Sequence, residues 1–109
     1  MANEEHLRIL KQGPEAWNEW KTNNPMVNPD LSEVDLREID FGAIHKERVA
    51  HGIALAGANL SKSQLAKVSL DGANLIGTNF SEADLSGSSL THTFMSNTNF
   101  SFADLSNGV

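Results

Sequence analysis

No cysteine occurs anywhere in the 109-residue sequence. The chain therefore has no disulfide, no thiolate metal ligand and no cysteine nucleophile, and cysteine usage leaves its redox compartment open. Long apolar runs are also missing: no stretch approaches the roughly 20 residues that a bilayer requires, and residues 1–11 lack the apolar segment of a signal peptide. We therefore expect a cytoplasmic protein with no membrane contact and no cofactor.

Positive charge is scarce as well. Eight lysine and arginine residues oppose fourteen aspartate and glutamate residues, which gives a formal charge of −6. Proteins that bind nucleic acid rely on clustered basic side chains for their phosphate contacts. The sequence therefore predicts no direct binding to nucleic acid.

A period of five dominates the second half of the sequence. From Leu55 onward a large apolar residue returns at every fifth position, a spacing that neither an α-helix nor a β-strand produces. A small residue stands two positions before nearly every one of them, often with a short polar residue between the two. The large residues are Leu55, Leu60, Leu65, Leu70, Leu75, Phe80, Leu85, Leu90, Met95, Phe100 and Leu105.

The units AGANL, DGANL, SEADL and SFADL resemble the pentapeptide-repeat family, whose consensus is A(D/N)LXX, and the resemblance extends backward through PDLSEVDLREIDF. It implies an all-β solenoid, a right-handed quadrilateral β-helix in which four repeats close one coil. Each residue then stacks on its counterpart four repeats later. The core ladders that follow are Leu60, Phe80 and Phe100 on one internal face and Leu65, Leu85 and Leu105 on the next.

The same stacking predicts polar ladders on the surface. Short side chains at the corners of a coil commonly bond to the backbone, so we interpret these ladders as structural. No base stands beside a serine, and the sequence has neither a glycine-rich phosphate loop nor a Ser-His-Asp arrangement, which argues against an enzyme. The ladders are Asn59, Asn79 and Asn99, and Ser61, Ser81 and Ser101.

Residues 1–29 are predicted to form a helical cap and a connector. Asn3 can cap a helix that begins at Glu4, and Gly13 and Pro14 divide the segment into two short helices, with proline in the first turn of the second. Trp17 and Trp20 then lie close together and cover the apolar floor of the first coil, because the end of a solenoid needs a cap.

Residues 30–109 are predicted to form a β-helix of about four coils with a phase break at 42–54. The step from Phe41 to Leu55 is not a multiple of five, so one face must bulge or loop out. Polar insertions on a regular scaffold can carry function, but an ordinary surface loop explains this one as well. His45 and His51 fall in the break without the further ligands that a metal site needs.

The C-terminal coil carries apolar residues at outward positions. Phe94 replaces the usual Asn or Asp, and Phe102 occupies a position held by Lys62 and Glu82 on earlier coils. Together with Ile76 they form a candidate exposed apolar patch, which typically marks a partner surface. We expect a homodimer through this coil; a further coil that continues the solenoid is the alternative.

These features favour a non-enzymatic scaffold that binds an unidentified protein partner. Some members of the family resemble duplex DNA and bind type II topoisomerases, so a DNA-mimicking modulator of a topoisomerase or another DNA-binding protein is the alternative. Duplex DNA carries about one charge per 1.7 Å, whereas residues 55–105 offer four carboxylates against two lysines. The first coil is acidic, because Asp30, Glu33, Asp35, Glu38 and Asp40 face a single Arg37, and it could attract a basic surface or form a solvated face.

Overall fold

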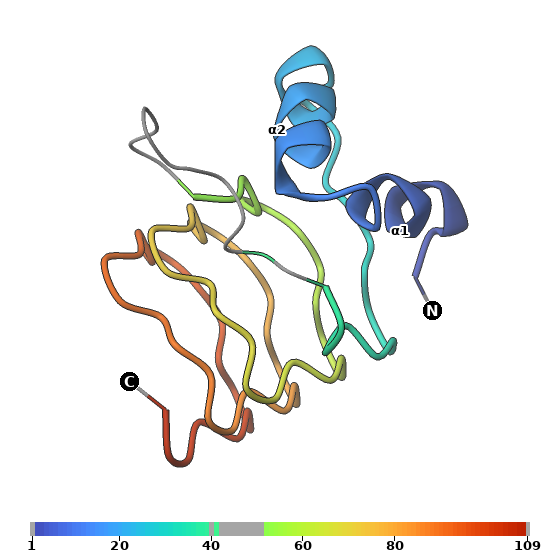
Figure 1. The fold of residues 1–109 in the computed structure, drawn as a ribbon. Coiled ribbons are helices and arrows are strands. Elements are labelled where there is room, and N and C mark those ends of the chain that lie inside the picture. The colour runs from blue at the N-terminus through green and yellow to red at the C-terminus, as the bar shows by residue number, and fades with distance from the viewer. Residues whose placement is uncertain (1, 40, 42–51, 109) are drawn as a thin grey trace.

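The computed structural model describes residues 2–39, 41 and 52–108. Two helices, α1 (Glu4–Leu10) and α2 (Pro14–Asn23), precede a stack of coils. Figure 1 shows the helices at one end of this stack and the residues near the C-terminus, in orange and red, at the other end. The chain thus has one covered end and one end that faces away from the helices.

Local signals define both helices, as the sequence predicted. The Asn3 side chain accepts hydrogen bonds from the backbone N–H groups of Glu5 and His6, at 2.8 and 3.1 Å, which pairs two donors that a helix leaves free at its first turn. Gly13, at a φ of 111°, separates the helices, and Pro14 opens α2. Proline fits there because the first turn needs no N–H donor.

Parallel bridges join residues of successive coils that lie twenty positions apart, for example Ala54 with Asn74 and Asn79 with Asn99. The bond pattern repeats at each bridge: Leu60 donates its N–H to the Asn79 carbonyl at 2.7 Å, and Asn79 donates its N–H to the Ala58 carbonyl at 2.9 Å. The bridges are isolated, so no named strand forms among the described residues. Four five-residue repeats therefore make one coil.

We call each column of stacked large residues, with its flanking backbone, a wall. The four walls are the Leu55 wall (Leu55, Leu75, Met95), the Leu60 wall (Leu31, Leu60, Phe80, Phe100), the Leu65 wall (Leu36, Leu65, Leu85, Leu105) and the Leu70 wall (Leu70, Leu90).

The first coil is longer than the others. Asp30 bridges Asn59 and Asp35 bridges Gln64, so these partners lie twenty-nine positions apart instead of twenty. The regular spacing resumes at Ala54, which bridges Asn74. The nine additional residues therefore enter between Asp35 and Ala54, around the predicted phase break. Residue 40 and residues 42–51, which make up most of that break, lie outside the described part of the chain.

The core is a column of large side chains with small ones between them. Leu60, Leu65, Phe80 and Leu85 are fully buried, and Ala73 and Ala83 fill the space beside such residues. A buried hydroxyl needs a partner, and the Thr78 Oγ1 finds one by donating to the Leu55 carbonyl at 2.7 Å. This packing makes each coil depend on its neighbours.

The helices close the first edge of the stack. Trp17 is fully buried and its Nε1 donates to the Ala54 carbonyl at 2.8 Å. The Asn18 side chain imitates a further coil: its Nδ2 donates to the Gly52 carbonyl at 3.1 Å and its Oδ1 accepts from the Ala54 N–H at 2.8 Å. Trp20 packs against Trp17, with ring centroids 5.1 Å apart.

A second set of bonds closes the Leu60 wall. Asp30 donates its N–H to Nδ1 of His6 at 3.1 Å, and its carbonyl accepts from the N–H of Asn3 at 2.8 Å. Backbone groups that would otherwise need another coil are thus paired with the cap. No such cover exists at the other end of the described chain.

Candidate interaction surface

We call the side of residues 90–108 that faces away from the helices the open edge. Its core side chains are only partly covered: Met95 is 40% exposed and Leu105 44%, whereas their counterparts Leu75 and Leu85 are fully buried. Leu90 and Phe100 are intermediate. Phe100 and Leu105 therefore stand in the predicted core ladders by position, but they form the surface of the last coil.

Backbone groups of the open edge are unpaired. Within the described residues, no backbone bond is made by the N–H groups of Met95, Phe100 and Leu105. The carbonyl groups two positions earlier, on Thr93, Thr98 and Ala103, also lack a backbone partner there. In the earlier coils the equivalent groups are bonded to the next coil. Such an edge is a template for another chain, because exposed N–H and C=O groups favour pairing.

Three apolar side chains point outward near this edge. Ile76 is 42% exposed, Phe94 61% and Phe102 92%. Phe94 bridges Asn74, and the Gly77 N–H donates to the Ser96 carbonyl, so Ile76 and Phe94 lie on the Leu55 wall, one coil apart. The predicted patch therefore has a core of two residues within one chain.

Phe102 lies elsewhere on the coil. It follows Phe100 at the corner between the Leu60 and Leu65 walls, below Lys62 and Glu82, and the whole Leu60 wall separates it from Phe94. Its φ is 60°, in the left-handed region that costs an ordinary side chain roughly 1–2 kcal/mol. A fully exposed aromatic ring in this conformation contributes nothing to the packing of its own chain.

The polar ladders have the structural role that their spacing predicted. Asn59, Asn79 and Asn99 each accept the backbone N–H of the serine two positions later, at 3.0, 2.9 and 2.8 Å. Aspartates do the same on the Leu65 wall, where Ser86 and Ser106 also donate their hydroxyls to Asp84 and Asp104. These side chains hold the corners of the coils.

The acidic first coil contains its own internal pairing. Arg37 donates to both carboxylate oxygens of Asp35, at 2.9 and 2.7 Å, and these bonds lower the pKa of that carboxyl to about 2. Partial burial raises the pKa of Asp30, but hydrogen bonds from Ser32 outweigh it and leave the pKa below its ordinary value. The acidic charge of this coil is thus partly neutralised.

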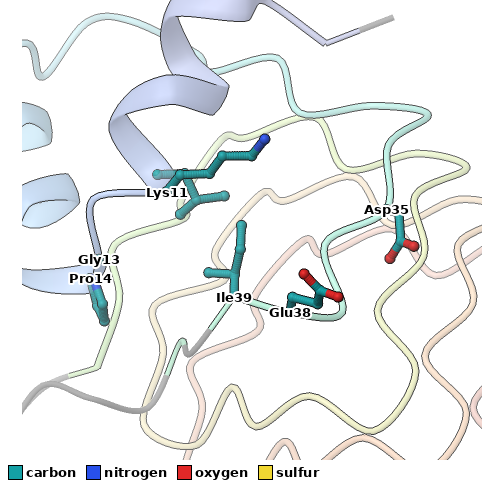
Figure 2. Close-up of a pocket in the computed structure, with 7 residues that line it drawn as sticks. Lys11, Gly13, Pro14, Asp35, Glu38 and Ile39 are labelled. Atoms are coloured by element: carbon teal, nitrogen blue, oxygen red, sulfur yellow. The ribbon is translucent and has the colours of Figure 1, made fainter.

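A hollow of about 590 Å³ lies between the cap and this coil. Figure 2 shows Asp35 and Glu38 from the first coil, and Lys11 and Pro14 from the helical segment, around it. Its lining combines apolar side chains with charges of both signs. Such a lining provides no catalytic pair, because no base is placed beside a nucleophile among these residues.

Two further structural observations concern other classes of protein. Among the described residues, no three His, Asp or Glu side chains cluster in a way that suits a metal ion, and His45 and His51 lie outside that part. Neither α1 nor α2 is long and apolar enough to cross a membrane.

Sequence reasoning missed the residues that join the cap to the first coil. Asn18 and His6 carry no repeat signal, and their bonds to the coils join positions more than twenty residues apart. The only clue in the sequence was that the first coil has a neighbouring coil on one side only, so its other side needs a cover.

Coils that stack through parallel bridges around a shared core define a β-helix solenoid. A family model described as pentapeptide repeats, with eight copies, matches residues 55–91 and 78–108. The chain belongs to the pentapeptide-repeat family. A comparison with curated proteins finds no match.

Proposed function

We propose that the protein is a non-enzymatic interaction scaffold, with coils wound as a right-handed quadrilateral β-helix, and that it associates with a second copy of itself through its C-terminal coil. The open edge carries this proposal. It combines exposed core side chains, Met95 and Leu105, with unpaired backbone groups, and partner surfaces are typically built from such features.

The outward aromatic residues add support. Phe94 and Phe102 are both exposed, and aromatic residues are enriched in interfaces between proteins. The Asn and Asp side chains at the corners of the coils accept hydrogen bonds from their own backbone instead of forming a reactive group, which supports a binding role over catalysis.

Light scattering on the native chain tests this function. We expect a particle of twice the 11.8 kDa chain mass, and we expect the double variant Phe94→Asp, Phe102→Asp to be a folded monomer. Met26→Asp is the matched control, because Met26 is 90% exposed and lies in the connector. A native chain that remains monomeric at micromolar and higher concentrations would contradict self-association.

A further inference from the structure

We infer that two copies of the chain join as an antiparallel pair about a two-fold axis through Asn99. This inference rests on the proposed self-association and specifies the partner and the register of the contact. It follows from the backbone groups of the open edge, from the winding of the last coil and from the positions of the exposed aromatic residues.

The open edge is complementary to itself in the antiparallel direction. Around Asn99 it presents the Thr98 carbonyl and the Phe100 N–H, both without a backbone partner in the described residues. A widely spaced pair of antiparallel bonds joins an N–H on one strand to a carbonyl on the other, reciprocally, across two facing residues. When Asn99 faces Asn99 of the second copy, the Phe100 N–H of each copy donates to the Thr98 carbonyl of the other.

The cap disfavours a head-to-tail arrangement. On two walls, the groups that a parallel neighbour would need on the first coil are already bonded: Asp30 to His6 and Asn3 on the Leu60 wall, and Ala54 to Asn18 on the Leu55 wall. An open edge therefore finds more free backbone groups on a second open edge than on the capped edge. Contact between two identical surfaces gives a closed pair and not a filament.

The winding of the coil selects the register. Successive walls of the last coil lie progressively further from the helices, so the edge is a ramp. Two such edges stay at a constant distance only if the residues near 90 of each copy face the residues near 108 of the other. The two-fold axis then passes through the middle of residues 90–108. An axis at Phe94 would make the later walls overlap by one coil, and an axis at Asp104 would leave the earlier walls one coil apart.

This register places each large side chain of the edge opposite a small residue. Phe100 faces Thr98 of the second copy, and Met95 faces Ala103. Leu105 faces Thr93, and Leu90 faces Gly108. The alternation of large and small residues within each coil is thus continued across the contact, as close packing requires.

The same register brings the outward aromatic residues together. Phe94 faces Asp104 of the second copy, and Phe102 of the second copy faces Ser96. Phe94 and Phe102 of the second copy are then diagonal neighbours. Such residues lie roughly 7–8 Å apart, a distance that aromatic side chains can span. Ile76 stacks one coil above Ser96. Residues that a whole wall separates within one chain therefore form one cluster across the axis, and the symmetry generates it twice.

Charge on the last coil agrees with this contact. Between residues 90 and 108 the only formal charge at neutral pH is that of Asp104, and lysine and arginine are absent. Exposed edges usually carry such charges, lysine above all, to prevent pairing. In the proposed register Asp104 faces an aromatic residue and no like charge.

Cysteine cross-linking of the full chain tests the register, since the native sequence has no cysteine. Directly facing residues without mutual hydrogen bonds have Cα atoms about 4.5 Å apart, within the range of a disulfide. We expect Asn99→Cys to form a covalent dimer on mild oxidation. Asn79→Cys is the matched control, because Asn79 makes the same turn bond one coil away from the edge.

Two further variants separate the alternatives. Phe94→Cys and Asp104→Cys face each other in the proposed register, so each alone should not cross-link and a mixture of the two should. If light scattering shows a dimer but Asn99→Cys fails to cross-link, or Phe94→Cys or Asp104→Cys cross-links with itself, the register is wrong and self-association stands. A monomeric native chain overturns both.

Discussion

Phe80 and Phe100 lie face to face in successive coils, with ring centroids 5.3 Å apart and ring planes within 6° of each other. Phe80 is fully buried between Leu60 and Phe100, whereas Phe100 has a neighbour of the core ladder on one side only. Two identical residues of one ladder therefore occupy an interior and a surface.

This difference predicts unequal costs of truncation. Phe80→Ala should lower the free energy of unfolding by about 3–5 kcal/mol, because a large buried side chain leaves a cavity. Phe100→Ala should cost clearly less at protein concentrations where the chain is monomeric. Urea unfolding followed by circular dichroism measures both. Equal costs in dilute solution would show that the last coil is covered.

The side-chain bonds of Asn18 predict that the cap depends on this residue. Asn18→Ala leaves the partly buried Gly52 carbonyl and Ala54 N–H without their partners and should lower the free energy of unfolding by about 1–3 kcal/mol. Asn23→Ala, on an exposed position of the same helix, is the control and should have little effect. Thermal unfolding of the two variants in parallel makes the comparison, and similar melting temperatures would argue against a bonding role.

Two glycines should respond differently to substitution. A Cβ at Gly52 would lie 2.8 Å from the Asp71 carbonyl oxygen, so Gly52→Ala forces the backbone of two coils apart and should cost about 1–3 kcal/mol. Gly77, at a φ of 70°, has only one atom within 4 Å of that position, at 3.9 Å, and asparagine tolerates the left-handed conformation. Gly77→Asn should therefore fold with near-native stability, as urea unfolding can verify.

Phe102 should trade stability of the monomer against association. Phe102→Asn replaces an aromatic residue at a φ of 60° with one that accepts this conformation more readily, so the monomer should gain a fraction of the roughly 1–2 kcal/mol that the left-handed region costs. The same change removes an aromatic side chain from the contact and should weaken dimerisation. Unfolding in dilute solution and sedimentation equilibrium measure the two effects separately; a loss of both would point to a packing role within one chain.

Acid should destabilise the fold through Asp71. Partial burial raises the pKa of Asp71, but hydrogen bonds from Ser89 and Thr91 of the next coil outweigh it and lower the pKa below its ordinary value. The unfolded chain then binds more protons than the folded one below about pH 4. This contribution is present above that pH and is lost as the pH falls toward the folded-state value. Asp71→Asn should flatten the fall in urea midpoint between pH 5 and 3, and Glu15→Gln should not.

The period of five and the resemblance to pentapeptide-repeat proteins together allowed the columns of the core to be predicted, because that resemblance implies that four repeats close one coil. Asn3 and Pro14 likewise predicted the helix starts, since capping depends on neighbouring residues only. The length of the first coil was not predictable, because the register between Asp30 and Asn59 is decided by contacts across twenty-nine positions. The separation of Phe94 from Phe102 also required the corners of the coil to be placed in space.

The first edge is covered by the helices and the last edge is open, and the chemistry of neither edge depends on how many coils lie between them. Each inner coil adds the same bridges and the same layer of core, so a twenty-residue insertion would lengthen the body by about 4.8 Å without altering either end. The length of such a protein can therefore change by whole coils during evolution, while the surface that recognises another molecule stays the same.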